Sequence, residues 1–387
     1  MKTMTFLNRA TRIAVVCSAL FAVSAVSNAA EKIKLGFLGP LSGGSSYEGQ
    51  GARNGFLLAI QQANDSGDYP FEVEPVVLDD ASDPTVGASA ALKLINDNKV
   101  VAATGHWNSP VALATIPIFH RKKMPFIVWG AISPKITEAA YPSISRVVPT
   151  SLMENQPLAD WAVNEQNWKR FAIISDTSDY GSSNTTAFTN YVEKEGGEII
   201  STDASPVGTT NFRSVLSRIK TENPDAVYFG GVVTEASLVR MQMNDLGMEN
   251  IPMLGISGIY DEKLVEITKE KGDGIIASVQ KVQDSPQLIA FNDAYEAANF
   301  SQSAGTYAKY SYDATNILLD VIKKEGIKDK GKLAQAIRDI KYEGAVGLTH
   351  FDENGQTLLK IDADRYIVKD GKWQQLDSVT EEVSVSP

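Results

Sequence analysis

The chain has 387 residues, of which 43% are hydrophobic and 21% charged, a composition typical of globular proteins. Its formal net charge of −11 makes nucleic acid a poor partner. The length predicts two domains, and the sequence contains no solenoid repeat, low-complexity tract or long block of like charge.

The first 29 residues have the three parts of a secretory signal peptide. A basic region precedes an apolar run at residues 13–26, and Ser27-Asn28-Ala29 supplies the small residues of a cleavage site. The apolar run is shorter than the ~20 residues that a membrane-spanning helix needs. We therefore expect a soluble, exported mature protein that begins near residue 30.

Cys17 is the only cysteine of the chain and lies inside this leader. It could in principle be the lipid-modified residue of a lipoprotein, but the apolar run continues beyond it to Val26, which favours a cleaved leader. The mature chain would then have no disulfide, no cysteine-based metal site and no cysteine nucleophile.

Apolar, β-branched runs then alternate with segments of helical period, which predicts an α/β protein with parallel sheets flanked by helices on both faces. The first series has predicted strands at residues 33–39, 71–78, 100–104 and 126–128 and predicted helices at 50–64, 84–96 and 111–121. The second series has predicted helices at residues 154–165, 182–195, 212–221 and 234–246 and predicted strands at 171–175, 198–204, 226–230 and 253–255. Each series is long enough for its own core, so two sheets are expected.

The pattern changes after the second series. Three consecutive helices are predicted at residues 287–299, 307–324 and 332–339, before short strands return around 349–351 and 365–368. The acidic tail after Asp377 is expected to fray.

Ligands of parallel α/β sheets bind at the carboxyl ends of strands, where loops meet helix N-termini with unpaired N–H groups. Four loops therefore are candidate sites, at residues 42–50, 105–110, 129–134 and 177–183. The glycine-rich turn at residues 39–44 lacks the spacing of a dinucleotide loop or a P-loop, so no cofactor is predicted from it. A flexible strand-to-helix turn explains its composition equally well.

Ser109 stands before Pro110, where a helix is expected to begin. Its hydroxyl and the neighbouring amides could hold a carboxylate beside the helix dipole, although a plain N-cap explains the same pattern. Ser133 before Pro134 has the same two interpretations.

Three aromatic residues also lie in the candidate loops. Trp107 and Trp129 would offer rigid faces to an apolar, aromatic or cationic ligand, and Tyr180 could close over a ligand from the second domain. Packing inside the protein explains each of the three equally well.

The sequence assembles no catalytic set. The three histidines lie far apart without metal-ligand spacing, and no Gly-x-Ser-x-Gly nucleophile elbow is present. We therefore predict neither enzymatic activity nor a metal site, and the alternative of a secreted hydrolase or transferase lacks a nucleophile and base.

Six short segments form a series whose order and intervals are specific. They are residues 33–43 (IKLGFLGPLSG), 79–84 (DDASDP), 105–109 (GHWNS), 179–181 (DYG), 225–231 (DAVYFGG) and 351–355 (FDENG). Over essentially the whole mature chain, this series resembles the periplasmic leucine/isoleucine/valine-binding protein family, the branched-chain amino acid receptors of ABC importers.

The resemblance implies the type 1 periplasmic-binding fold, with two doubly wound parallel-sheet lobes joined by three hinge crossings. These crossings are expected near Pro149, Val279 and Leu348. The implied organisation is a signal peptide at residues 1–29, an N-terminal lobe at 30–149 plus 280–348, and a C-terminal lobe at 150–279 plus 349–387.

The resemblance also implies binding residues. In the family, the residues matching Ser109, Gly130 and Ile132 hold the α-carboxylate and ammonium of the ligand, and a second-lobe tyrosine matches Tyr180. The threonine of the family is replaced by Ile132, with Ser133 adjacent as a possible substitute.

Other departures concern the ammonium group and a disulfide. The family's ammonium-binding glutamate falls on Ser257, and one of its contact tyrosines falls on Val232. Its first-lobe disulfide is missing, because Ser82 and Asn108 replace the cysteines. An α-amino acid ligand is therefore not assured by the resemblance.

A buried ammonium without a carboxylate partner would be costly, so either Glu48 supplies the charge or the ligand has no such group. Glu48 with Trp107 and Trp129 would suit an amine or quaternary nitrogen, whereas the tryptophans alone would suit an aromatic carboxylate or an amide. Tyr47, beside Glu48, is a further candidate contact.

We predict a monomeric periplasmic binding protein that captures an amino acid or related small polar metabolite between its lobes and delivers it to the membrane permease of an ABC importer. The alternatives are the same fold with an aromatic acid, amide or amine ligand, or a ligand sensor. No cofactor, metal or nucleic acid is expected in any of these functions.

Overall fold

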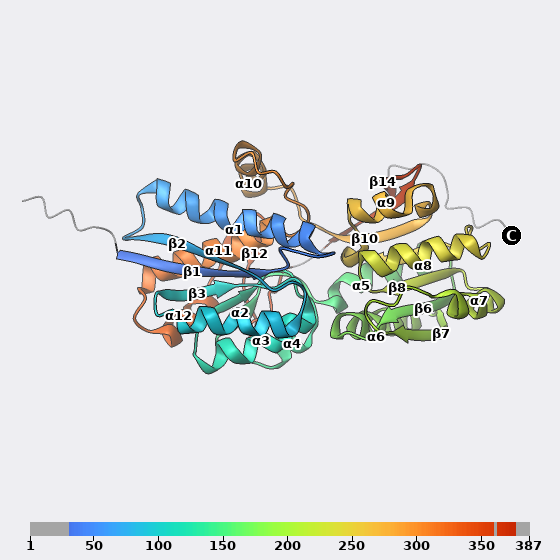
Figure 1. Cartoon of the computed structure of the whole chain (residues 1–387), viewed down its shortest axis with the longest axis horizontal. Coiled ribbons are helices and arrows are strands. Elements are labelled where there is room, and N and C mark those ends of the chain that lie inside the picture. Colours follow the sequence, from blue (N-terminus) through green and yellow to red (C-terminus); the bar gives the residue numbers. More distant parts are fainter. Residues whose placement is uncertain (1–30, 360–361, 377–387) are drawn as a thin grey trace, which may run out of the picture.

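The computed structural model describes residues 31–359 and 362–376. The predicted signal peptide, Cys17 and the tail after Asp377 lie outside the described residues. The described chain forms two α/β lobes arranged along the long axis of the molecule (Figure 1). The predicted α/β architecture with two largely parallel sheets is confirmed.

The first lobe is built on a five-stranded parallel sheet with the order β2-β1-β3-β4-β5. Its strands are β1 (Glu31–Gly39), β2 (Phe71–Asp79), β3 (Val100–Thr104), β4 (Phe126–Val128) and β5 (Ile144–Arg146). Both faces of the sheet are covered, as is usual for parallel sheets. Along β1, Leu35 and Phe37 therefore enter one core while Leu38 enters the core on the other face.

Helices cover the two faces of this sheet in pairs. On one face α1 (Ser46–Ser66) packs against α11 (Ala308–Glu325), and on the other α2 (Pro84–Asn96) packs against α3 (Ser109–Arg121). The lobe is completed by α4 (Lys135–Glu138), α10 (Pro286–Ala297), α12 (Lys330–Arg338) and the small hairpin of β11 (Tyr342–Gly344) and β12 (Gly347–Thr349).

The second lobe has a seven-stranded sheet with the order β14-β13-β10-β9-β8-β6-β7. Its parallel strands are β6 (Arg170–Asp176), β7 (Glu198–Ser205), β8 (Ala226–Gly230), β9 (Met253–Ile256) and β10 (Ile275–Lys281). The antiparallel strands β13 (Asp362–Lys369) and β14 (Lys372–Gln375) form a hairpin at one edge. Both turn residues of this hairpin, Asp370 and Gly371, have positive φ, which is the conformation that an Asp-Gly hairpin turn requires.

The second sheet is also covered on both faces. One face packs against α5 (Ser151–Asp160), the π-helical turn η1 (Trp161–Glu165) and α6 (Asp179–Lys194). The other packs against α7 (Arg213–Glu222), α8 (Val233–Asp245) and α9 (Glu262–Thr268), with the short 3-10 turns η2 (Ser257–Ile259) and η3 (Lys269–Gly272) beside them. Among the described residues, none of the helices combines the length and apolar content needed to cross a bilayer.

Several elements differ from the sequence-based expectation. The predicted helix at residues 154–165 is divided into α5 and η1, and α6 begins at Asp179 rather than at residue 182. The earlier start follows from the N-cap, because the Ser178 hydroxyl accepts a hydrogen bond from the Gly181 N–H. Tyr180 therefore lies in the first turn of a helix and not in a loop. The elements α4, β5, α9, β10, β11 and β14 were not predicted.

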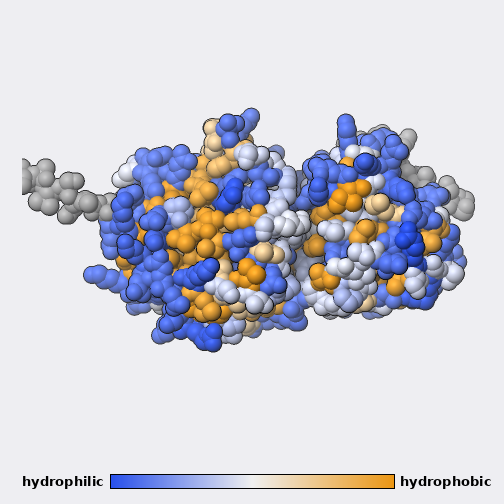
Figure 2. Space-filling view, in the orientation of Figure 1, coloured by the Kyte–Doolittle hydropathy of each residue, from blue (hydrophilic) through white to orange (hydrophobic). Residues whose placement is uncertain are grey.

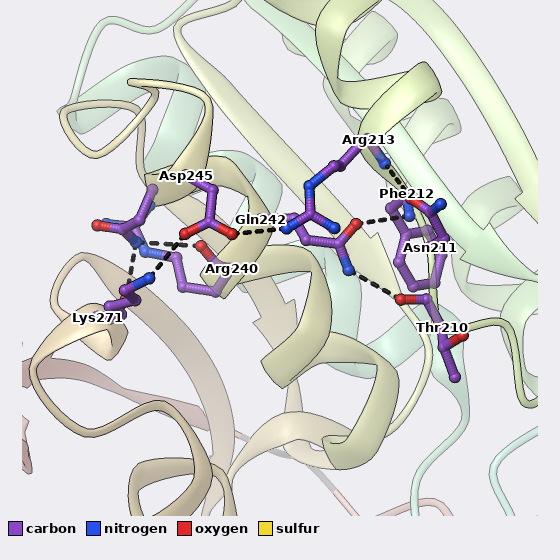
Figure 3. Close-up of polar contacts among 9 residues, drawn as sticks. Thr210, Asn211, Phe212, Arg213, Arg240, Gln242, Asp245 and Lys271 are labelled. Atoms are coloured by element: carbon purple, nitrogen blue, oxygen red, sulfur yellow. Dashed lines mark hydrogen bonds and ion pairs between the residues drawn. The ribbon is translucent and has the colours of Figure 1, made fainter.

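Polar side chains of α8 fix the segment between β7 and α7 (Figure 3). Gln242 accepts a hydrogen bond from the Phe212 N–H at 2.7 Å and donates one to the Thr210 carbonyl at 2.9 Å. Asp245 joins Arg213 to Lys271 across the same surface. The segment 206–212 is thus held at residues 210–212, next to α7.

The chain passes between the lobes three times: between β5 and α5, between β10 and α10, and between β12 and β13. The third passage comes later than the expected position near Leu348. The Arg146 N–H donates to the Gly355 carbonyl and the Thr357 N–H donates to the Arg146 carbonyl, so residues 355–357 still lie beside the first sheet.

The contact between α1 and α11 depends on Gly55. A Cβ atom at this position would lie 2.1 Å from the carbonyl oxygen of Ala308, so any side chain would separate the two helices. We predict that Gly55→Ala lowers the free energy of unfolding by about 1–3 kcal/mol through overpacking. Chemical denaturation measures the effect.

The matched control is Gly331→Ala on the exposed first turn of α12, where the nearest atom is the flexible Asp329 carboxylate at 3.3 Å. There the better helix propensity of alanine should leave stability unchanged or raise it by about 0.5–1 kcal/mol. Equal effects of the two substitutions would contradict the assigned helix contact.

Candidate functional site

A cavity of about 300 Å³ lies between the lobes, at the carboxyl ends of their strands. Figure 2 shows the gap between the lobes as a groove across the surface. From the first lobe the lining residues are Gly44 and Ser45 after β1, Ser82 after β2, Trp107, Asn108, Ser109 and Pro110 after β3, Gly130 after β4, and Tyr307 before α11. From the second lobe they are Asp176, Ser178 and Tyr180 around the end of β6, Val207 and Gly208 after β7, Val232, Thr234 and Glu235 after β8, and Gly258 after β9.

Ser109 places a hydroxyl and a helix N-terminus on the first-lobe wall. It is the first residue of α3, and its Oγ accepts a hydrogen bond from the Ser133 N–H at 3.1 Å. The hydroxyl proton of Ser109 therefore remains able to donate into the cavity. The first N–H groups of a helix have no intrahelical partner, so this corner of the cavity suits a carboxylate.

Ile132, Ser133 and Trp129 do not line the cavity but lie behind its first-lobe wall. All three are buried, and Ser133 contributes through its backbone N–H to Ser109. The Trp129 ring stacks on Phe37 at a centroid distance of 5.8 Å, and its Nε1 donates to the Leu38 carbonyl at 3.3 Å. Its contacts are therefore those of a core residue.

Trp107, in contrast, faces the cavity. Its ring meets Tyr307 edge-on at a centroid distance of 6.3 Å, and both residues line the first-lobe wall. Together they form an aromatic surface that suits the apolar part of a ligand.

The second-lobe wall presents Tyr180 and Val232. The Tyr180 hydroxyl is buried and has no hydrogen-bond partner among the described residues. It lies close to Gly258, where a Cβ atom would be 2.0 Å from the Tyr180 Oη. Val232 lines the cavity as the N-cap residue of α8.

Two carboxylates that we did not predict line the cavity. Asp176, the last residue of β6, accepts a hydrogen bond from the Ser178 N–H at 2.8 Å, and burial raises its pKa. Glu235, in the first turn of α8, accepts a hydrogen bond from the Gly208 N–H at 2.8 Å. This contact fixes the cavity end of the segment 206–212, whose other end is held by Gln242. Among the described lining residues there is no lysine, arginine or histidine.

The sequence contained only weak signals for these carboxylates. Asp176 fell between the predicted strand at residues 171–175 and the candidate loop at 177–183, and no role was predicted for it. Tyr307 was the first residue of the predicted helix at 307–324, and its position at the cavity follows only from the packing of α11 on the first lobe.

Ser257, Glu48 and Tyr47 lie outside the 300 Å³ cavity. Ser257 and Glu48 line a neighbouring space of about 40 Å³, and Ser257 donates to Glu154 at 2.6 Å. Tyr47 lies farther out, where its hydroxyl is 2.5 Å from the Ser303 Oγ at the edge of another crevice between the lobes.

Glu48 is a buried carboxyl group whose Oε2 has no hydrogen-bond partner among the described residues. Its pKa is raised from 4.5 to about 8, mainly by burial and also by the nearby Asp261, whereas Lys309 opposes the shift. Within residues 31–359 and 362–376, no group of three histidine, cysteine, aspartate or glutamate side chains could hold a metal ion.

The raised pKa of Glu48 predicts a pH dependence of stability. Between pH 4.5 and 8 the folded state holds a proton that the unfolded state releases, so the free energy of unfolding should fall as the pH rises. We predict that Glu48→Gln makes this fall smaller between pH 5 and 7.5, as measured by chemical denaturation. The same change at exposed Glu343 is the control, and equal slopes for Glu48→Gln and wild type would contradict the prediction.

A second prediction concerns the wall formed by Tyr180. Gly258→Ala would place a methyl group where the Tyr180 hydroxyl lies, so Tyr180 must move. We expect ligand affinity to fall by about tenfold or more while the fold is retained, because one wall of the cavity changes shape. Calorimetric titration measures the affinity, and unchanged affinity would exclude Tyr180 from the ligand contacts.

Comparisons with known proteins agree with this architecture. Residues 32–364 match the model of a family described as periplasmic binding protein. The leucine-, isoleucine-, valine-, threonine- and alanine-binding protein of Pseudomonas aeruginosa is 28% identical over 346 residues, which cover 87% of this chain and 92% of that protein.

Two solved structures extend the comparison. The leucine-binding protein LivK from Thermotoga maritima has a TM-score of 0.80 and 28% identity, with 89% of this chain and 97% of that chain covered. A solute-binding protein of an ABC transporter from R. palustris, in complex with 4-hydroxybenzoate, has a TM-score of 0.78 and 24% identity, with 89% and 95% covered. At 24% identity, the second comparison shows only that the two proteins share a fold.

Proposed function

The chain belongs to the periplasmic binding protein family, and from this premise we propose that its cavity captures a small zwitterionic amino acid. The family predicted from the sequence is thereby confirmed. Members of this family are substrate-binding proteins of the periplasm that deliver a small molecule to the membrane permease of an ABC importer. We propose binding without turnover for this chain as well.

One observation supports this choice of ligand: the two walls of the cavity have opposite electrostatic character. The Ser109 hydroxyl and the α3 N-terminus on the first lobe suit a carboxylate. Asp176 and Glu235 on the second lobe suit an ammonium group. An α-amino acid has both groups, and the 300 Å³ volume suits a molecule of this size.

We further propose that Ser109, Gly130, Trp107, Tyr180 and Val232 contact the ligand directly, because all five line the cavity. Trp129, Ile132 and Ser133 would support this wall from behind. Glu48, Tyr47 and Ser257 would act only at the margin, because they lie beside the cavity rather than on its wall.

The mechanism that we propose is closure of the two lobes around the ligand. A ligand that touches both walls binds the closed form more tightly and so shifts the equilibrium towards it. Lys135 of α4 and Asp179 of α6 already join the two rims at 2.6 Å. Exposed pairs of this kind contribute at most about 1 kcal/mol, so the ligand must supply most of the closing free energy.

A thermal-shift screen tests the proposal. The panel contains the common amino acids, aliphatic amines, amides and aromatic acids, each far above the expected dissociation constant, since a ligand specific for the folded state raises the melting temperature. We predict that apolar amino acids give the largest shifts. Larger shifts with aromatic acids or amides would favour the alternative ligand class, and no shift with any compound would contradict the proposed function.

Ser109→Ala tests the carboxylate end of the cavity. Removing one hydrogen bond to a charged group should weaken amino acid binding by roughly tenfold to a hundredfold. Ser89→Ala, on the exposed face of α2, is the matched control and should bind like wild type. If Ser109→Ala also binds like wild type, the carboxylate is held elsewhere.

A further inference from the structure

A line of hydroxyl groups leads from the cavity to a buried carboxylate. Tyr307 lies on the first-lobe wall, and its hydroxyl donates to the Ser257 Oγ at 3.2 Å. Ser257 in turn donates to the Glu154 Oε2 at 2.6 Å. Glu154 does not line the cavity and is only 3% exposed, so these two hydroxyls are its hydrogen-bonded route towards a ligand.

A second series of contacts leads from Glu154 through Gln280 to the first lobe. Its Oε1 accepts from the side-chain amide of Gln280 on β10, and the Gln280 carbonyl accepts from the Tyr310 hydroxyl on α11. Glu154 follows the first passage between the lobes, and Gln280 precedes the second. The carboxylate thus lies where the hinge segments meet the first-lobe wall.

The ionisable groups that face Glu154 are four tyrosines: Tyr180 on α6, Tyr228 on β8, and Tyr307 and Tyr310 beside or on α11. Arg365 of β13, which also packs against α5, has its guanidinium over the Trp161 ring at 5.5 Å. Burial is the main cause that raises the pKa of Glu154 to about 7, and the hydrogen bonds from Ser257 and Gln280 oppose it.

Proton counting fixes the direction of the hydroxyl line. An ionised carboxylate only accepts hydrogen bonds, and each hydroxyl has one proton to give. The Ser257 proton is therefore directed at Glu154, and the Tyr307 proton is directed at Ser257. Because its proton is directed at Ser257, the Tyr307 hydroxyl can offer any further partner only an oxygen lone pair, which accepts.

We propose that Glu154 is a specificity-determining residue that acts through Ser257 to hold the Tyr307 hydroxyl as a hydrogen-bond acceptor, so that the cavity selects ligands with an N–H or O–H donor at this point. The inference rests on the proposed function and adds to it a residue outside the cavity. When Glu154 is protonated it can itself donate, the line can reverse, and the Tyr307 proton can turn towards the ligand. Selection for donors should therefore increase as the pH rises through about 7.

The experiment compares the amino acid that gives the largest thermal shift with its 2-oxo acid, which replaces the ammonium donor by a carbonyl acceptor. Calorimetric titration at pH 5.5, 7 and 8 gives both affinities for wild type, Glu154→Gln and Ser257→Ala. In wild type the affinity ratio of amino acid to oxo acid should rise by about tenfold across this range. This corresponds to a difference of about one unit between the pKa of Glu154 in the two complexes. In both variants the ratio should be smaller and independent of pH.

Ser278→Ala is the matched control, because it removes a buried hydroxyl of β10 that has no hydrogen-bond partner among the described residues. It should keep the wild-type pH profile. Circular dichroism establishes that each variant is folded. If Glu154→Gln does not fold, Ser257→Ala interrupts the line while keeping the Glu154 side chain in place.

The outcomes separate this inference from the proposed function. If wild type binds the amino acid but Glu154→Gln and Ser257→Ala keep its ratio and its pH profile, the role of Glu154 is overturned while the proposed function stands. If no amino acid binds wild type at any pH, the proposed function fails and this inference fails with it.

Discussion

The direction of the strands is the constraint on which the site depends. In each lobe the parallel strands end at one edge of the sheet, and the two edges face each other across the gap. Loops and helix N-termini, with their unpaired N–H groups, therefore line a single cavity from two sides. An antiparallel sheet would distribute these groups over both of its edges. The pairing of two parallel sheets thus accounts for both the position and the polarity of the cavity.

Buried carboxyl groups around the gap are the second feature of the molecule. Asp176, Glu48 and Glu154 are all at least nine-tenths buried, and burial raises the pKa of each. Keeping such groups costs stability unless hydrogen bonds or a charged partner offset the loss of water. Asp176 and Glu154 have hydrogen bonds from serine or glutamine, whereas one oxygen of Glu48 has none among the described residues. A cationic ligand near these groups would recover part of this cost.

The sequence was sufficient for the fold because periodicity is a local property. Apolar strands and amphipathic helices are each visible within about 10 residues. Short elements were missed because tertiary contacts, not local pattern, stabilise them: β5 has three buried residues, and its Arg146 is hydrogen-bonded to Gln356, 210 positions away. The β13–β14 hairpin is different, because its Asp370-Gly371 signal was present in the sequence and was overlooked.

The site was less accessible to sequence reasoning. Trp107 and Trp129 have equivalent positions after successive strands, yet only the first faces the cavity, and the orientation of a side chain after a strand depends on packing. Glu154 gave no signal because its partner Ser257 is 103 positions away. The resemblance to a family indicated that Ser257 replaces a glutamate. Only the fold shows that the Glu154 carboxylate lies beside that position.

Closure of the two lobes around a bound ligand can be measured directly. Residues 31–387 contain no cysteine, so a pair of spin labels can be placed at Ser89→Cys on α2 and Glu193→Cys on α6, both exposed. Pulsed electron resonance then measures the distance between the lobes with and without the amino acid that most stabilises the protein. If the lobes close, the distance distribution with ligand should be shorter and narrower. An unchanged distribution at saturating ligand would contradict it.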